Sequence, residues 1–91
     1  IDPGFGFSKT TQQNYELFNN LEFFKEFQRP IIIGISRKSM IYKILNTTPE
    51  KALNGSSILH TISLMKGANI LRTHDVKEAL ECVKIVSQLN G

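Results

Sequence analysis

The sequence predicts a parallel α/β fold, in which short buried strands alternate with helices. Three consecutive isoleucines at 31–33 are typical of a strand covered on both faces of a parallel sheet. A second apolar stretch at 68–72 has the length of another strand. Segments with helical periodicity flank both stretches, and the connections between them are short, as in a parallel α/β architecture.

The first helix is expected over residues 11–27. Apolar side chains recur there at the spacing of one helical face, at Leu17, Leu21, Phe24 and Phe27. Pro30 ends this helix, because the residue before a proline is disfavoured in the helical conformation. The strand at 31–33 follows directly.

The second half of the chain repeats the strand and helix pattern. A short helix is expected over 38–45, and a longer one from about residue 48 to residue 66, starting at a threonine, a proline and a glutamate. The strand at 68–72 comes next. Asp75, with Glu78 three residues later, has the pattern of a capping box and starts the last helix.

Composition excludes several classes of protein. The chain has 91 residues, a net charge of +3 and basic residues that are scattered singly, which argues against a nucleic-acid partner. Its one cysteine, Cys82, excludes an intrachain disulfide and favours a reducing cytosol. No apolar stretch approaches the roughly 20 residues that span a membrane. The chain opens at Ile1 without an initiator methionine, so we expect it to be part of a longer protein.

Three polar segments, at 2–10, 36–40 and 72–76, each lie where a strand ends and a helix begins. The carboxyl ends of parallel strands meet at one edge, which is where such folds bind ligands. We therefore expect a shared site for a polar, anionic ligand.

The first segment alternates glycines with Phe5 and Phe7, and begins with Asp2. One interpretation is a pair of aromatic walls around a flat ligand, with Asp2 bound to an N–H edge of its ring. The alternative is a tight turn with two tucked-in aromatic side chains and a capping carboxylate. A glycine-rich loop alone does not distinguish them.

The other two segments carry the cations. Lys38 and its neighbours begin a helix, where backbone N–H groups favour an anion, although a solvated basic turn has the same pattern. In an extended backbone Arg72 and His74 lie on the same side and Thr73 lies opposite, so two donors meet at one point. The alternative there is a surface Arg–Asp pair beside a helix cap. His60, mid-helix, is expected to be structural or exposed.

The segments DPGFGFSKT, GISRKSMI and RTHDVKEA resemble, in order and spacing, motifs of the dihydropteroate synthase family of the folate pathway. The resemblance covers essentially all 91 residues. It implies that residues 1–91 are the C-terminal part of a single pterin-binding TIM (β/α)₈ barrel domain. That part comprises about three βα units, from the end of strand six to helix eight.

The resemblance also implies the reaction. The family condenses 6-hydroxymethyl-7,8-dihydropterin diphosphate with p-aminobenzoate, giving 7,8-dihydropteroate and diphosphate, with Mg²⁺ as cofactor. The family's Mg²⁺ ligand would lie upstream, so no metal-binding residue is expected in this chain. A cytoplasmic homodimer, which is the target of sulfonamides, is implied as well, with no nucleic-acid or membrane partner. By itself the chain is expected to lack activity.

Residue roles carry over from the same resemblance. Asp2, Lys38 and Arg72 would bind the pterin, Arg72 and His74 would hold the diphosphate, and Lys38, Arg72 and His74 would be catalytic. The p-aminobenzoate pocket would be formed by Phe5, Phe7 and Ser39. Thr73 stands where such sequences more often have valine and is expected to point away from the ligand.

Two alternatives remain open. A pterin-dependent methyltransferase has a similar barrel but needs no diphosphate cradle. A small anion-binding or nucleic-acid-binding module would bind polynucleotides with a steep dependence on salt.

Overall fold

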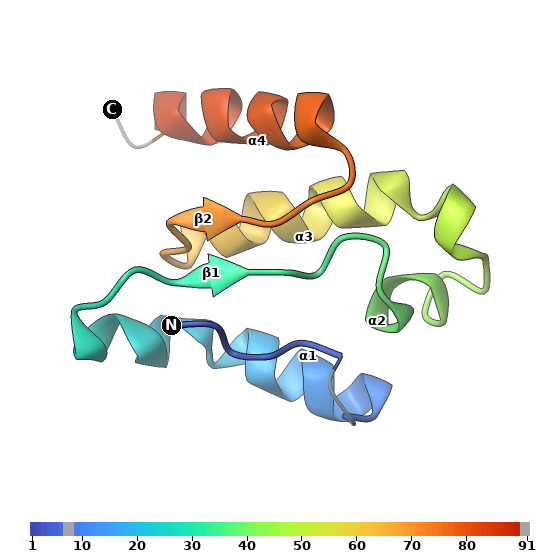
Figure 1. Ribbon diagram of the computed structural model, residues 1–91, viewed down its shortest axis with the longest axis horizontal. Helices are drawn as coiled ribbons and strands as arrows, with labels where there is room; N and C mark the ends of the chain where they lie inside the picture. Colours follow the sequence, from blue (N-terminus) through green and yellow to red (C-terminus); the bar gives the residue numbers. More distant parts are fainter. Residues whose placement is uncertain (7–8, 90–91) are drawn as a thin grey trace.

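The computed structural model describes residues 1–6 and 9–89, and its strands β1 (Ile32–Ile33) and β2 (Ile70–Leu71) pair in parallel (Figure 1). Ile32 lies opposite Ile70, and the Arg72 N–H donates to the Ile33 carbonyl at 2.8 Å. On the other side of β1, the Ile32 N–H donates to the Ile1 carbonyl at 2.7 Å. The start of the chain therefore runs along β1, and the three polar segments leave the same edge.

The prediction of one continuous helix over 11–27 is wrong. Helix α1 (Thr11–Asn19) begins with a capping box between Thr10 and Gln13, as the Thr10 hydroxyl accepts the Gln13 N–H. It ends at Asn20, whose side-chain amide donates to the carbonyl of Glu16 at 2.8 Å. A 3-10 segment, η1 (Leu21–Phe27), continues the chain. The local hydrogen bond of an asparagine side chain competes with helix continuation, which apolar periodicity does not reveal.

The middle helices are also shorter than expected. Helix α2 spans Ser39–Tyr42 and is followed by turns. The expected start near residue 48 gives only a 3-10 turn, η2 (Pro49–Lys51), and helix α3 begins after it (Leu53–Met65). Gly67, with φ +109°, follows the end of α3, in a conformation that glycine adopts without strain.

Helix α4 (Val76–Leu89) completes the chain. In Figure 1 the strands run between α1 and η1 on one side and α3 and α4 on the other. The core is made of apolar side chains from the first segment, α1, η1, β1 and its flanking residues, and α2, including Phe5, Leu21, Ile31, Ile33 and Met40. Among the described residues, no helix combines the length and the apolar character that crossing a membrane requires.

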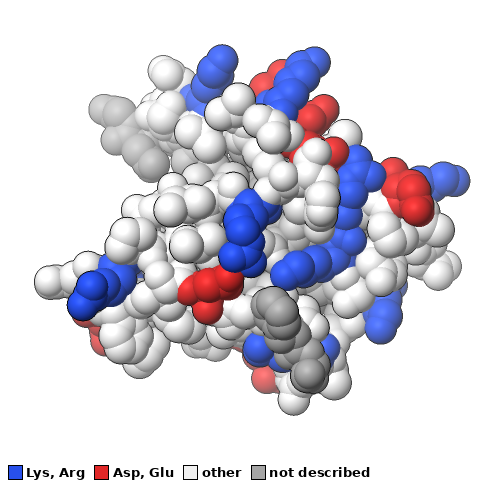
Figure 2. Space-filling view, in the orientation of Figure 1, with Lys and Arg blue, Asp and Glu red and all other residues white. Residues whose placement is uncertain are grey.

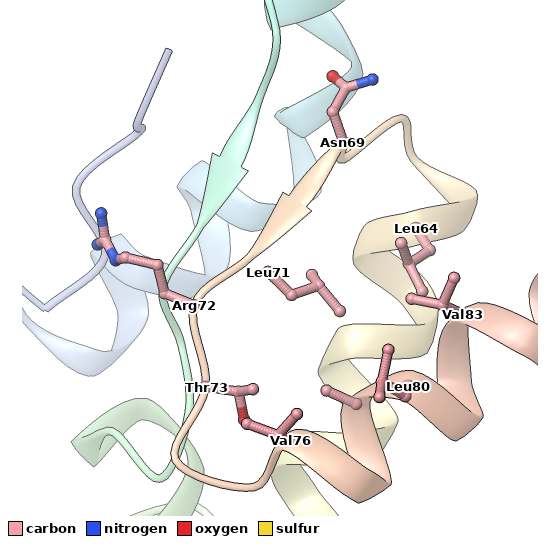
Figure 3. A pocket seen from close by; sticks show the side chains of 9 residues that line it. Leu64, Asn69, Leu71, Arg72, Thr73, Val76, Leu80 and Val83 are labelled. Atoms are coloured by element: carbon pink, nitrogen blue, oxygen red, sulfur yellow. The ribbon is translucent and has the colours of Figure 1, made fainter.

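An apolar cavity of about 520 Å³ lies between β2, α3 and α4. Figure 3 shows Leu71, Leu80 and Val83 gathered on this side of the strand, while Arg72 extends to the other side. Ile70 and Leu80 are about half exposed. The Arg72 guanidinium thus lies on the opposite side of β2 from the apolar side chains of this cavity.

Candidate functional site

Asp2 and Arg72, 70 positions apart in sequence, form an ion pair with 2.6 Å between Oδ2 and the guanidinium. The other carboxylate oxygen of Asp2 accepts the Gly4 N–H at 2.9 Å. Burial by itself would raise the pKa of Asp2, but the Gly4 N–H and the Arg72 guanidinium outweigh it and hold the pKa below its usual value. Asp2 is therefore a carboxylate at neutral pH, oriented by two donors.

Lys38 lies just before α2 in an extended conformation, and its ammonium group donates to the Phe5 carbonyl at 2.6 Å. Burial lowers the pKa of Lys38, and the positive charge of Arg72 lowers it further, while Asp2 acts in the opposite direction. A partly desolvated ammonium group of this kind binds an anion or a carbonyl oxygen more strongly than a solvated one.

A polar cavity of about 260 Å³ brings two of the three segments together. Its lining comes from the ends of β1 and β2 and the loops that follow them: Gly34, Ser36, Lys38, Arg72, Thr73 and His74. The Arg72 guanidinium covers Gly34 so closely that a Cβ added there would lie 2.4 Å from one of its nitrogens. Asp2 joins this cluster through Arg72. The four residues Asp2, Lys38, Arg72 and His74 thus lie together, as the strand ends predicted.

The Thr73 side chain lies on the opposite side of the backbone from Arg72, toward Val76 (Figure 3), as expected from the alternation of a strand. Thr73 lines both the apolar cavity and the polar one. Its hydroxyl lies 3.4 Å from the Ser36 hydroxyl. Ser36 also contacts His74, at both the backbone N–H and ring Nδ1.

Arg37 has a different role from that of its neighbour Lys38. Its guanidinium binds both carboxylate oxygens of Asp75 at 2.9 Å and donates to the carbonyls of Pro49 and Glu50. Hydrogen bonding to Asp75 raises the pKa of Arg37, and the same bond lowers that of Asp75. Arg37 therefore joins the loops after β1 and β2 to each other and to η2. The Arg–Asp pair proposed as an alternative for this region exists, but it uses Arg37 and not Arg72.

Residues assigned to the aminobenzoate pocket are only partly brought together. Phe5 and Ser39 both line a cavity of about 470 Å³ beside Lys38. The Phe5 side chain, however, is 1% exposed and packs on Phe18 with 5.7 Å between ring centroids. Phe5 thus combines the two interpretations, because it is a core side chain at the edge of a cavity. Phe7 lies outside the described residues.

Sequence reasoning missed the residues that hold the first loop. Asn14 is fully buried in α1, where its side-chain oxygen accepts the Gly6 N–H at 2.8 Å and its amide donates to the Thr10 carbonyl. The Lys9 ammonium group donates to the Gly4 carbonyl at 2.9 Å. Asn14 lies four residues before Phe18 and seven before Leu21, on the apolar face, and this position was the available signal.

The charged side chains of this site differ from those of a metal-binding site. Figure 2 shows basic and acidic side chains side by side in the middle of the face that it displays. Within the ranges 1–6 and 9–89, no group of three His, Cys, Asp or Glu side chains could hold a metal ion. A hard cation such as Mg²⁺ takes several oxygen ligands, and the one carboxylate of this cluster, Asp2, is already engaged by Arg72. The described residues fit an anionic ligand better than they fit a metal ion.

Comparison with known proteins places this geometry in a family. The model of the family "Pterin binding enzyme" matches residues 1–74. Dihydropteroate synthase of Escherichia coli strain K12 is 46% identical over 86 residues, which are 94% of this chain and 30% of that protein. The chain thus spans about a third of the length of such relatives.

Solved structures agree with the sequence comparison. Dihydropteroate synthase of Yersinia pestis superposes with a TM-score of 0.95 at 43% identity, covering 98% of this chain and 42% of that one. The Coxiella burnetii synthase in complex with pteroic acid gives a TM-score of 0.91 at 43% identity, over 96% of this chain and 33% of that one. These enzymes are TIM barrels, so the prediction of a partial barrel is confirmed. With a family match over most of its length and a fold shared with these synthases, the chain belongs to the pterin-binding enzyme family.

Proposed function

We propose that this chain is one part of a dihydropteroate synthase, which joins 6-hydroxymethyl-7,8-dihydropterin diphosphate to p-aminobenzoate. The observation that carries the proposal is the polar cavity at the ends of β1 and β2, where Lys38, Arg72 and His74 lie beside the oriented carboxylate of Asp2. The similarity to synthases over nearly the whole chain supports it. Because the chain spans about a third of those relatives, the activity is proposed for the full-length protein, and the chain alone is expected to be inactive.

Roles follow from the chemistry of each group. The Asp2 carboxylate would accept N–H groups from the pterin edge, and the Lys38 ammonium group would donate to a ring nitrogen or carbonyl of the pterin. Arg72 and His74 would bind diphosphate oxygens, since a guanidinium group binds such oxygens through two parallel hydrogen bonds. For this purpose Arg72 must turn from Asp2 to the ligand. Its side chain is 52% exposed, so exchanging one charged partner for another involves little desolvation.

The reaction would then be one of positioning and charge stabilisation. The bond between the pterin methylene carbon and the diphosphate oxygen breaks, and its electron pair leaves with the diphosphate. Arg72, through its positive charge, and His74, through a hydrogen bond, stabilise the charge that develops on the leaving group, which lowers the barrier most in a site from which water is excluded. The arylamine, held near Lys38 and Ser39 in the cavity that Phe5 borders, attacks the carbon with its nitrogen lone pair and then releases one N–H proton to solvent.

Mg²⁺ belongs to the proposal as a cofactor held outside the described residues. When bound it would neutralise diphosphate charge. The function proposed for the full-length protein also includes a homodimer in the cytoplasm, in which apolar side chains of α3 and α4 that are exposed here would be covered. These include Ile58, Met65 and Ile85.

The test is turnover of the two substrates by the full-length synthase with Arg72→Gln, compared with Arg29→Gln at an exposed position. Arg72→Gln should lower kcat/KM by about a hundredfold or more, since it removes a cation from the leaving group. Arg29→Gln should retain activity. Equal turnover by both variants, or no inhibition by diphosphate, would contradict the proposal. The second result would favour the methyltransferase alternative, which has no diphosphate to bind.

A further inference from the structure

The Ser36 hydroxyl lies at the meeting point of the loops after β1 and β2. It is buried, with only 6% of the residue exposed. Three groups approach its oxygen: the His74 backbone nitrogen at 3.2 Å, His74 ring Nδ1 at 3.3 Å and the Thr73 hydroxyl at 3.4 Å. None of the site roles proposed above uses Ser36 or Thr73.

Counting protons assigns a direction to these contacts. A serine hydroxyl has two lone pairs and one proton. The His74 backbone N–H can only donate, so it takes one lone pair of Ser36. The Thr73 hydroxyl donates to Ser36 at 3.4 Å and takes its second lone pair, while the Thr73 oxygen accepts the Asp75 N–H at 3.0 Å. The remaining group, ring Nδ1 of His74, then receives the proton of Ser36.

We propose that Ser36 and Thr73 are positioning residues that hold the neutral His74 ring as the tautomer protonated on Nε2. Because Nδ1 accepts the Ser36 proton, the single ring proton of the neutral form must reside on Nε2. The ring then donates a hydrogen bond to an anion without carrying a charge. That the anion is a diphosphate rests on the proposed function, whereas the tautomer itself does not.

Charged neighbours make a neutral donor useful at this point. Lys38 and Arg72 line the same cavity, and Asp75, next to His74 in sequence, is already bound by Arg37. The other imidazole ring that interacts electrostatically with Asp75, that of His60 on α3, is buried. A neutral His74 adds a donor to the cavity without placing a third positive charge beside Lys38 and Arg72.

Ring-nitrogen NMR on the full-length protein without ligand tests the tautomer directly. Long-range ¹H–¹⁵N spectra distinguish the two neutral tautomers, and the His74 signals are assigned by their loss in His74→Asn. The wild-type ring should be predominantly protonated on Nε2 once it is neutral. Ser36→Ala should shift it toward a mixture of tautomers, and Ser63→Ala should not. Ser63 is also a buried serine, but its hydroxyl donates within α3 to the Leu59 carbonyl.

A second pair of variants covers the case in which Ser36→Ala does not fold. Thr73→Val replaces the hydroxyl with a methyl group, and Thr73→Ser retains the hydroxyl. Thr73→Val should move the ring part of the way toward the mixture, and Thr73→Ser should leave it unchanged. A wild-type ring protonated on Nδ1, or variants with the same tautomer ratio as wild type, would overturn the proposal.

Pyrophosphate binding supplies a functional measurement with its own pH signature. When the His74 ring is neutral, Ser36→Ala should weaken binding by about three- to tenfold, the value of one hydrogen bond. On the acid side the effect should vanish, because an imidazolium ring carries protons on both nitrogens. The same loss at both pH values would overturn the tautomer role. If the wild-type protein held the Nε2 tautomer but did not bind pyrophosphate, the proposed function would fail and the tautomer assignment would stand.

Discussion

Gly34→Ala is expected to disable ligand binding while leaving the fold intact. An added Cβ would lie 2.4 Å from an Arg72 guanidinium nitrogen and 3.0 Å from two further atoms of that group. Ordinary contact begins at 3.4 Å, so the guanidinium must move by at least about 1 Å. That shift is enough to break its 2.6 Å bond to Asp2 and to displace the group from the cavity.

Gly34→Ala should change ligand affinity more than it changes the stability of the fold. The Asp2–Arg72 pair is half exposed, so its loss costs at most about 1 kcal/mol of stability. Replacing glycine by alanine also restricts the conformations of the unfolded chain, which stabilises the folded protein by about 0.4–1 kcal/mol. Binding depends on a hydrogen bond to a charged group, worth about 1.5–3 kcal/mol, so affinity for pyrophosphate should fall by about tenfold to a hundredfold.

Gly55→Ala is the matched control. Its Cβ would lie 2.3 Å from the side chain of Ile41, which is buried, and 3.1 Å from that of Leu45. Overpacking of this kind costs about 1–3 kcal/mol and lies between α2 and α3, away from the cavity. Calorimetric titration of pyrophosphate, with urea unfolding of the same full-length proteins, should therefore separate the two variants. Normal affinity with reduced stability in Gly34→Ala would refute the reasoning.

Three further predictions concern the supports of the site. Burial lowers the pKa of His60 below 6.5. The neutral ring therefore stabilises the fold above that pH, and this stabilisation is lost as the pH falls and the ring takes up a proton. In His60→Leu, urea unfolding should show a weaker dependence of stability on acid pH. Asn14→Ala leaves the Gly6 N–H without its acceptor and should cost about 1–3 kcal/mol of stability, with faster amide exchange at Gly6; unchanged exchange would exclude the contact. Phe5→Ala should cost about 3–5 kcal/mol in urea unfolding, because the ring fills the core against Phe18; a loss of aminobenzoate affinity with full stability would instead make Phe5 a pocket wall.

The positions of the helices and strands show how much of the fold local sequence patterns can predict. The isoleucine run at 31–33 lies at strand β1, with Ile31 and Ile33 buried and Ile32 partly exposed, as expected of a strand inside the fold. The helix expected over 11–27 divides at Asn20, where a side-chain hydrogen bond replaces a backbone one. Apolar periodicity continues through that point, so it could not reveal the break.

The two adjacent cations of GISRKSMI illustrate the same limit at the site. Arg37 and Lys38 are equivalent in a basic turn as far as spacing is concerned. In the structure Arg37 has φ +53° and binds Asp75, while Lys38 is extended and lines the cavity. Thr73 lies on the opposite side of the backbone from Arg72, as expected, but it lines both cavities.

By itself the sequence determined that three polar segments follow apolar strand ends, and parallel pairing then requires them to share one edge. Only the tertiary structure decided which charges neutralise each other and which face the cavity. Asp2 meets Arg72 across 70 positions, and Arg37 meets Asp75 across 38. Partner choice at such separations depends on backbone conformation and packing in three dimensions, and neither is contained in the local spacing of residue types.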